Sequence, residues 1–129
     1  MTDESRRRLA TCHPLIQNVI AIVDQVIPLQ VLCGHRGQVE QDLAYDTGKS
    51  KVKWPNGKHN SDPSLAVDVM PLPIDWKDTK RLCFFAGFVI AVADMKGIKF
   101  RWGGDWDGDT MLGEPNDDWD KPHFELKLK

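Results

Sequence analysis

Two histidines and one aspartate stand where polar loops of this 129-residue chain meet apolar runs. His59 lies near the end of a polar stretch, Asp68 lies inside the apolar run 65–72, and His123 opens a short apolar run at 123–128. A carboxylate among apolar strand residues is costly unless a cation or strong hydrogen-bond donors neutralise it. Two imidazoles and one carboxylate from separate segments suit a catalytic zinc ion, which takes three protein ligands and leaves one position for water. The sequence therefore predicts a zinc site at His59, Asp68 and His123.

Two further carboxylates flank the last histidine. Asp120 precedes His123 by three residues and Glu125 follows it by two, so either could take a proton from a zinc-activated water. The spacing alone is not diagnostic, because the chain has no HExxH motif that would place two histidines on one helical turn. The alternative is structural: His59 belongs to a loop, Asp68 accepts hydrogen bonds from backbone amides, and His123 packs at a strand end.

The elements that must position these residues follow from hydrophobic periodicity and from proline and glycine. Helices are predicted over residues 3–27, with Pro14 starting or kinking the longer part, and over 38–46 and 75–96. Strands are predicted over residues 29–33, 65–72, 98–102 and 123–128, and long polar loops over 50–64 and 103–121. The order has no βαβ rhythm, so we expect an α+β fold: a single domain over 1–129, with a small, mainly antiparallel sheet and about three helices.

The same patterns predict which helix positions are buried or capped. In helix 38–46, Val39, Leu43 and Ala44 are expected to face inward, with Gly48 as the C-terminal stop. Asp75 is expected to cap the last helix, whose buried stripe comprises Leu82, Phe85, Ala86, Val89, Ile90 and Ala93.

Composition argues against two classes of partner. A net charge of −2 and a pI near 6.0 give no basic excess for nucleic acid. The apolar stretch 15–23 is broken by Gln17 and Asn18, so neither a signal peptide nor a membrane span is expected. We expect a monomer that is synthesised in the cytoplasm and does not insert into membranes.

The cysteines lack the short paired spacing of a cysteine zinc site and lie among apolar residues. This predicts buried free thiols at Cys12, Cys33 and Cys83.

The segment 105–109 alternates aspartates with Trp106 and Gly108, like the start of a calcium loop. The twelfth position of such a loop is Asn116 here, where calcium loops carry glutamate. We therefore expect a solvated acidic rim, with Trp102 and Trp106 packing the domain or lining a substrate groove. A second metal at these carboxylates is the alternative.

Five blocks spread over residues 29–126 resemble the phage-type L-alanyl-D-glutamate peptidases, relatives of the D-Ala-D-Ala carboxypeptidases and dipeptidases with the hedgehog-like fold. The blocks are Gly34-His35-Arg36, Gly48-Lys49-Ser50-Lys51, the stretch from His59 to Ser64-Leu65-Ala66-Val67-Asp68, Trp102-Gly103-Gly104-Asp105, and Pro122-His123-Phe124-Glu125. The resemblance implies that His59, Asp68 and His123 are the zinc ligands and that Asp120 is the catalytic acid and base. It also implies that Arg36 stabilises the developing oxyanion or holds the substrate carbonyl, a task that suits a fixed guanidinium. His35, beside Arg36, is expected to support the site indirectly, and His13 to be structural.

The resemblance further implies a phage endolysin, made in the host cytoplasm without a signal peptide and acting on the bacterial cell wall after release. Its substrate would be the L-alanyl-D-glutamate bond of peptidoglycan stem peptides. The chain departs from the family pattern at Gly57, where serine is common, at Ser64, where glycine is common, and in the His59–Asp68 spacing of nine residues, which is longer by two. These departures put the loop's substrate contacts in question. The alternatives are a D-Ala-D-Ala carboxypeptidase or dipeptidase and a non-catalytic zinc-binding module of the same fold.

Overall fold

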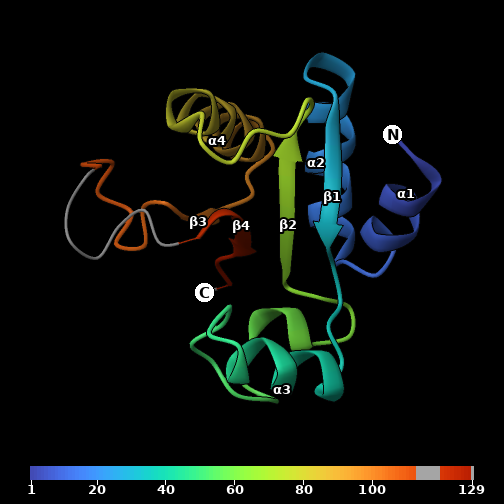
Figure 1. Ribbon diagram of the computed structural model, residues 1–129. Helices are drawn as coiled ribbons and strands as arrows, with labels where there is room; N and C mark the ends of the chain where they lie inside the picture. The colour runs from blue at the N-terminus through green and yellow to red at the C-terminus, as the bar shows by residue number, and fades with distance from the viewer. Residues whose placement is uncertain (113–119, 129) are drawn as a thin grey trace.

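The computed structural model describes residues 1–112 and 120–128 of the chain. These residues form four α-helices, a 3-10 helix (η1) and four strands (Figure 1). In chain order they are α1 (Asp3–Leu9), α2 (Pro14–Val26), β1 (Leu29–Cys33), α3 (Gln38–Asp46), η1 (Lys58–Asn60), β2 (Ala66–Pro71), α4 (Thr79–Met95), β3 (Phe100–Gly103) and β4 (Asp120–Leu126). The predicted α+β fold is confirmed.

The strands form one antiparallel sheet in the order β1-β2-β4-β3. Because side chains alternate along a strand, Val67, Val69 and Phe124 lie on one face and enter the core with α2 and α4. Asp68 and His123 therefore belong to the opposite face. In Figure 1, α2 lies behind the strands, and α3 with η1 forms a separate lobe below them. We call residues 38–65 the α3 lobe.

The N-terminal segment forms two helices where one was predicted. Pro14 starts α2, as one of the predicted options had it, because a residue before proline is held away from the α conformation. His13, the residue before it, is extended at φ −53° and ψ 142°, and its Nδ1 accepts a hydrogen bond from the Leu15 amide at 3.1 Å. His13 is therefore a helix cap, which agrees with its expected structural role.

Helix α3 has the predicted bounds, and Gly48 ends it with a φ of +80°. The prediction that Val39 and Leu43 face inward is wrong, because these side chains are 81% and 63% exposed. The inward positions are Ala44 and Gln41, and Gln41 is 1% exposed. Helix α3 does not pack on the apolar core but on the polar part of its own lobe, so its buried face is polar.

Helix α4 begins later than predicted. Asp78 accepts a hydrogen bond from the Arg81 amide and is the cap, whereas Asp75 accepts one from the Lys77 amide in the preceding turn. The prediction of Asp75 as the cap is wrong for that reason. The predicted stripe is buried except for Ile90, which is half-buried, and Gly97 ends the helix at φ +73°.

Two smaller differences concern the last strands and the thiols. β3 begins two residues later than predicted, and β4 begins at Asp120 rather than His123, which brings Asp120 into the sheet. The three cysteines form no disulfide, as predicted, yet only Cys12 is buried, and Cys33 and Cys83 are half-buried. Among the described residues, no helix has the length and apolar character needed to cross a bilayer.

Gln41 is expected to stabilise the α3 lobe. Its side-chain nitrogen donates to Ser50 Oγ and the Val52 carbonyl at 3.0 and 2.6 Å, and its Oε1 accepts from Asn60 at 3.1 Å. Gln41→Ala leaves these buried groups unpaired and should lower the free energy of unfolding by about 1–3 kcal/mol. Val39→Ala on the same helix is the control and should change it by no more than about 0.5 kcal/mol. Equal effects of the two variants in urea unfolding would contradict this role.

Candidate metal centre and active site

The structure brings the three predicted metal ligands together. Asp68 and His123 are direct partners in the β2–β4 ladder, and His59 reaches them from η1. His59 Nε2 lies 3.1 Å from Asp68 Oδ1 and 3.2 Å from His123 Nδ1, and His123 Nδ1 lies 3.2 Å from the same Asp68 oxygen. Around a tetrahedral zinc ion with bonds of about 2.0–2.1 Å, neighbouring ligand atoms are about 3.3 Å apart. The near-equal separations of these three atoms therefore fit a small tetrahedral cation.

Each imidazole is held by a hydrogen bond on its outer nitrogen. His59 Nδ1 lies 2.7 Å from the Gly34 carbonyl, and His123 Nε2 lies 2.9 Å from Glu125 Oε1. Both partners are acceptors, so the outer nitrogens can donate to them, and the inner nitrogen of a neutral ring then has a lone pair for a metal ion. The second carboxylate oxygen of Glu125 accepts from Arg101 at 2.8 Å. The arrangement turns the inner nitrogens of both rings toward Asp68.

The charges of the site favour a cation at its centre. Burial alone would raise the pKa of Asp68, but the neighbouring His59 and His123 hold it well below its usual range. Burial would likewise lower the pKa of His59, and the Asp68 carboxylate raises it instead. A metal ion and protons therefore compete for the same nitrogens, so metal affinity should fall as the pH falls.

Asp120 and Arg36 lie beside this triad. Asp120 Oδ2 is 3.7 Å from His123 Nδ1, and burial, followed by the nearby charge of Asp68, raises the pKa of Asp120 to about 6. Arg36 Nη2 is 3.7 Å from Asp68 Oδ2, and Arg36 Nη1 donates to Gln41 at 3.2 Å. All five residues predicted for the site thus line one cavity.

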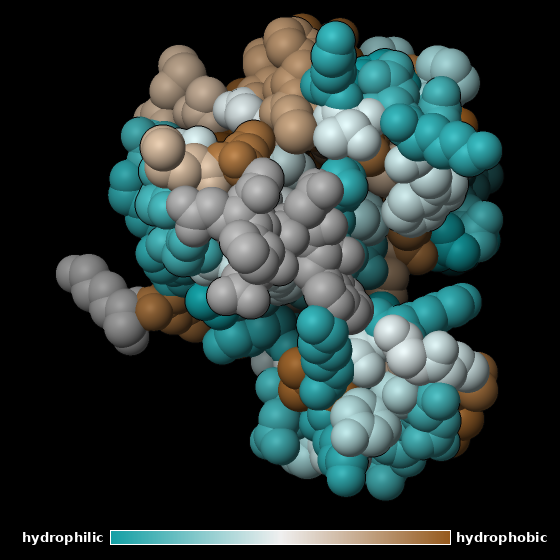
Figure 2. Space-filling model, turned by 60° about the vertical axis from the view of Figure 1, so that its left-hand side comes forward, coloured by the Kyte–Doolittle hydropathy of each residue, from teal (hydrophilic) through white to brown (hydrophobic). Residues whose placement is uncertain are grey.

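The cavity has a volume of about 870 Å³ and lies between the polar face of the sheet and the α3 lobe. Its wall on the lobe includes Lys49, Ser50 and Lys51, and its opposite wall includes Trp76 and Trp106. Figure 2 shows the largely hydrophilic lobe at the lower right, set off from the body by an indentation. A cleft of this size falls within the range of ligand-binding sites.

The comparisons with known proteins agree with this geometry. The chain matches the family described as phage L-alanyl-D-glutamate peptidase over residues 1–127. It belongs to this family. A solved structure, that of the Serratia marcescens L-Ala D-Glu endopeptidase ChiX, superposes with a TM-score of 0.76 at 27% identity, covering 98% of this chain and 89% of that chain. The resemblance predicted from the sequence blocks is confirmed, and the protein is a peptidase of the peptidoglycan-cleaving kind.

Trp102 and Trp106 were expected to pack the domain or to line a groove, and within this peptidase each does one of the two. Trp102 is 4% exposed, and its Nε1 donates to the Lys121 carbonyl, so it packs the domain. Trp106 lines the cavity, with its ring 5.4 Å from that of His123 and 5.5 Å from the Arg101 guanidinium. His35 does not line this cavity, and its Nδ1 lies 2.9 Å from the Ser61 carbonyl.

The acidic loop differs in part from its prediction. Asp105 is 8% exposed, whereas Asp107 and Asp109 are exposed, so the predicted solvated rim describes only the latter two. One oxygen of each carboxylate lies within 4.8 Å of the others. Asn116, the twelfth position of the calcium alternative, lies outside the described residues.

Sequence reasoning left Glu125 as a possible base and missed Arg101. Burial alone would raise the pKa of Glu125, but hydrogen bonds from His123 and Arg101 lower it to about 2. Glu125 is therefore engaged with His123 and Arg101, whereas burial raises the pKa of Asp120 to about 6. Arg101 and Glu125 are direct cross-strand partners. The alternation of 100–102 and 124–126, with a charge between two apolar residues in each, was the signal that could have paired them.

Glu125→Gln is expected to weaken metal binding by about 10–100-fold, because the carboxylate that orients His123 and raises its basicity is lost. The measurement is competition of the metal-free protein with a chromogenic chelator for Zn²⁺ or Co²⁺. Glu40→Gln, at an exposed position on α3, is the matched control and should leave the affinity unchanged. An unchanged affinity in Glu125→Gln would show that this hydrogen bond does not tune the site.

Gly103 makes room for Asp120, and Gly103→Ala should lower peptidase activity on the order of 100-fold by displacing that carboxylate. A Cβ at residue 103 would lie 2.0 Å from the Asp120 carbonyl oxygen and 2.9 Å from its Cβ. The control is Gly87→Ala in α4, where a Cβ meets no atom within 4 Å. Activity on purified peptidoglycan, compared with the thermal midpoint of each variant, is the measurement. Full activity in folded Gly103→Ala protein would contradict the argument.

Proposed function

We propose that this protein is a zinc-dependent endopeptidase that hydrolyses the L-alanyl-D-glutamate bond of peptidoglycan stem peptides, with the whole chain 1–129 as its catalytic domain. His59, Asp68 and His123 are the zinc ligands, Asp120 is the acid and base, and Arg36 stabilises the oxyanion. The observation that carries the proposal is the near-equilateral triangle of two nitrogens and one oxygen with a protonatable carboxylate beside it.

The donor set supports zinc over other metals. Two imidazole nitrogens and one carboxylate oxygen suit a borderline cation, whereas Mg²⁺ and Ca²⁺ prefer oxygen ligands throughout. A zinc ion bound there would act as a Lewis acid that polarises a peptide carbonyl and acidifies a water molecule.

Proton transfer falls to Asp120. A carboxylate works best as base and acid when its pKa approaches the working pH, and burial moves the pKa of Asp120 in that direction, to about 6. Asp120 takes the proton of the attacking water and returns it to the leaving amine as the peptide bond breaks. Glu125 does not compete for this task, because His123 and Arg101 hold both of its oxygens.

Arg36 supplies a fixed positive charge where negative charge develops. Its side chain is 19% exposed and is held by hydrogen bonds to Gln41 and Cys33 and by the ion pair with Asp68. A donor positioned before the reaction stabilises an oxyanion without reorganisation at the moment of bond breaking. Gln41 thus connects the α3 lobe to the site through Arg36.

The substrate proposal rests on family membership and on the charge of the cavity. Arg36, Arg101, Lys49, Lys51 and Lys58 contribute to its lining, which is complementary to the free carboxylates of a stem peptide. The family also supports the setting: a monomeric phage lysis enzyme that is made in the host cytoplasm and acts on the cell wall.

Asp120→Asn should cut stem peptides at less than about 1% of the wild-type rate, because the group that moves the proton is lost. Defined stem peptides are digested with zinc-loaded protein and the products are identified by mass spectrometry. Wild type should release a fragment with D-glutamate at its new amino terminus. Release of D-alanine would instead assign the D-Ala-D-Ala alternative, and no cleavage by wild type would favour a zinc-binding module.

The same variant gives a pH-dependent stability test of the metal-free protein. The pKa of Asp120 in the folded state lies above its ordinary value of 3.8, so its ionised form destabilises the fold. This penalty is fully present above about pH 6 and is lost as the pH falls toward 4. Asp120→Asn should therefore be more stable than wild type at pH 8, on the order of 1 kcal/mol, and the difference should shrink at low pH. A constant difference across this range would contradict the raised pKa.

A further inference from the structure

A bulge in the sheet turns Cys33 toward the metal centre. Along the β1–β2 ladder Leu29, Gln30 and Val31 pair with residues 71, 70 and 69 in regular register, and then Cys33, not Leu32, pairs with Asp68. In an unbroken ladder Cys33 would oppose Val67 and share the helix-covered face. The extra residue reverses the side on which Cys33 lies, because successive side chains of a strand alternate between faces. Cys33 consequently lies on the face of Asp68 and His123.

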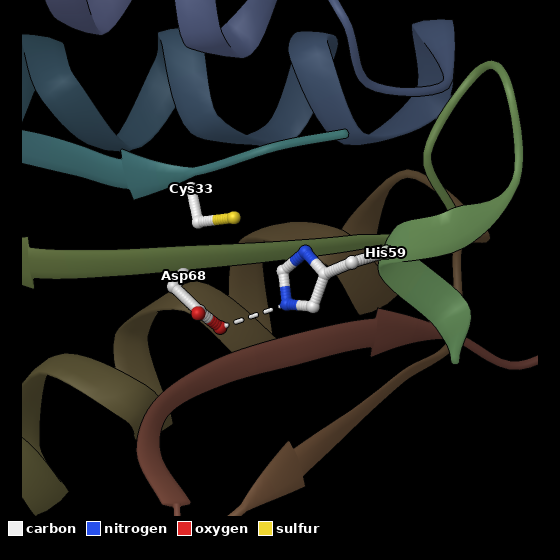
Figure 3. A group of neighbouring side chains, drawn as sticks. All are labelled: Cys33, His59 and Asp68. Carbon is white, nitrogen blue, oxygen red and sulfur yellow. Dashed lines mark hydrogen bonds and ion pairs between the residues drawn. The ribbon is translucent and has the colours of Figure 1, made fainter. Parts of the chain in front are cut away.

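The sulfur lies within reach of two of the proposed zinc ligands. Cys33 Sγ, one nitrogen of His59 and one oxygen of Asp68 all lie within 4.8 Å of one another. Figure 3 shows the three side chains coming from the end of β1, from η1 and from β2 toward one space. Around a tetrahedral ion such atoms would be about 3.5 Å apart, so the sulfur would have to move closer to His59 and Asp68 to share an ion with them.

The surroundings of the sulfur suit a negatively charged ligand. Arg36 Nη2 lies 3.7 Å from Cys33 Sγ and carries a permanent positive charge. The Gly34 carbonyl, which orients His59, also lies 3.5 Å from the sulfur. The same short segment, residues 33–36, therefore holds the thiol, the carbonyl that orients the histidine and the guanidinium.

We infer that Cys33 is a fourth protein ligand for the metal, a role that rests on the proposed zinc centre. With His59 and Asp68 it forms a thiolate-containing set that shares two ligands with the catalytic set. The ion it takes is a borderline or soft divalent cation such as Zn²⁺, Co²⁺ or Cd²⁺. To hold the ion, the Cys33 thiol would release its proton to solvent, and its sulfur would take the position that catalysis needs open. A four-ligand site of this kind would be closed, and the sulfur would have to leave before water and substrate could enter.

Cobalt substitution tests this inference separately from the zinc proposal. The metal-free protein is titrated with Co²⁺ under reducing conditions, and its absorption is recorded for wild type, Cys33→Ser and Cys83→Ser. Visible d–d bands report that the ion is bound, and a near-ultraviolet sulfur-to-cobalt charge-transfer band reports a thiolate ligand. We expect both signals in wild type and in Cys83→Ser, and only the d–d bands in Cys33→Ser.

Two outcomes overturn the inference in distinguishable ways. Wild type with d–d bands but no charge-transfer band excludes Cys33 as a ligand and leaves the metal centre intact. Wild type without d–d bands shows that the centre binds no cobalt, and the proposed metal site fails together with the inference.

A measurement on wild type alone guards against a Cys33 variant that does not fold. Cys33 also lines a second, smaller cavity of about 340 Å³, which gives an alkylating reagent a route to it. Alkylation by iodoacetamide is followed by peptide mapping, with Cys83 as the internal reference. Zn²⁺ should slow alkylation of Cys33 at least tenfold and leave Cys83 unchanged. Equal rates at Cys33 with and without Zn²⁺ would overturn the inference.

Discussion

The direct pairing of Asp68 with His123 across the β2–β4 ladder is the constraint on which the site depends. Side chains of a strand alternate between faces, so a slip of one residue would place Asp68 in the core beneath α2 and α4 and pull His123 away from it. The register is held from the other face, where Val67 opposes Phe124 within the core. The hydrophobic core thereby sets the position of two polar residues that it does not contain.

Most charged side chains around this pair face a side chain of opposite charge or a hydrogen-bond partner. Asp68 faces two imidazoles and a guanidinium, His123 is held by Glu125, and Glu125 is held by Arg101. Buried carboxylates are tolerated only with such partners. Asp120 is the exception, since burial raises its pKa and no guanidinium or amide hydrogen bond to its carboxylate is seen in the described part of the chain. A carboxylate in that state can exchange a proton near neutral pH, which is the role proposed for Asp120.

The α3 lobe, which forms one wall of the cavity, is polar in its buried part as well as on its surface. Gln41 fills the space between α3, the loop at 50–52 and η1, and its Oε1 accepts from both Asn60 and Arg36. The same set of hydrogen bonds therefore holds the lobe together and places the guanidinium beside Asp68. Arg36 and the α3 lobe thus share one hydrogen-bond acceptor, the Gln41 side-chain oxygen.

Local patterns in the sequence were sufficient for the fold class and most element bounds, and the resemblance of five sequence blocks was sufficient for the family. Hydrophobic periodicity and proline positions report how each segment meets solvent or core, which is a property of the segment itself. The inward face of α3, the pairing of Glu125 with Arg101 and the turn of Cys33 toward Asp68 depend on partners from distant segments. Val39 and Leu43 are apolar yet exposed because the surface that α3 covers is polar, and Cys33 changes face because of one extra residue in β1. Such pairings are decided only when the chain folds, since no periodicity within one segment encodes the residue that will oppose it.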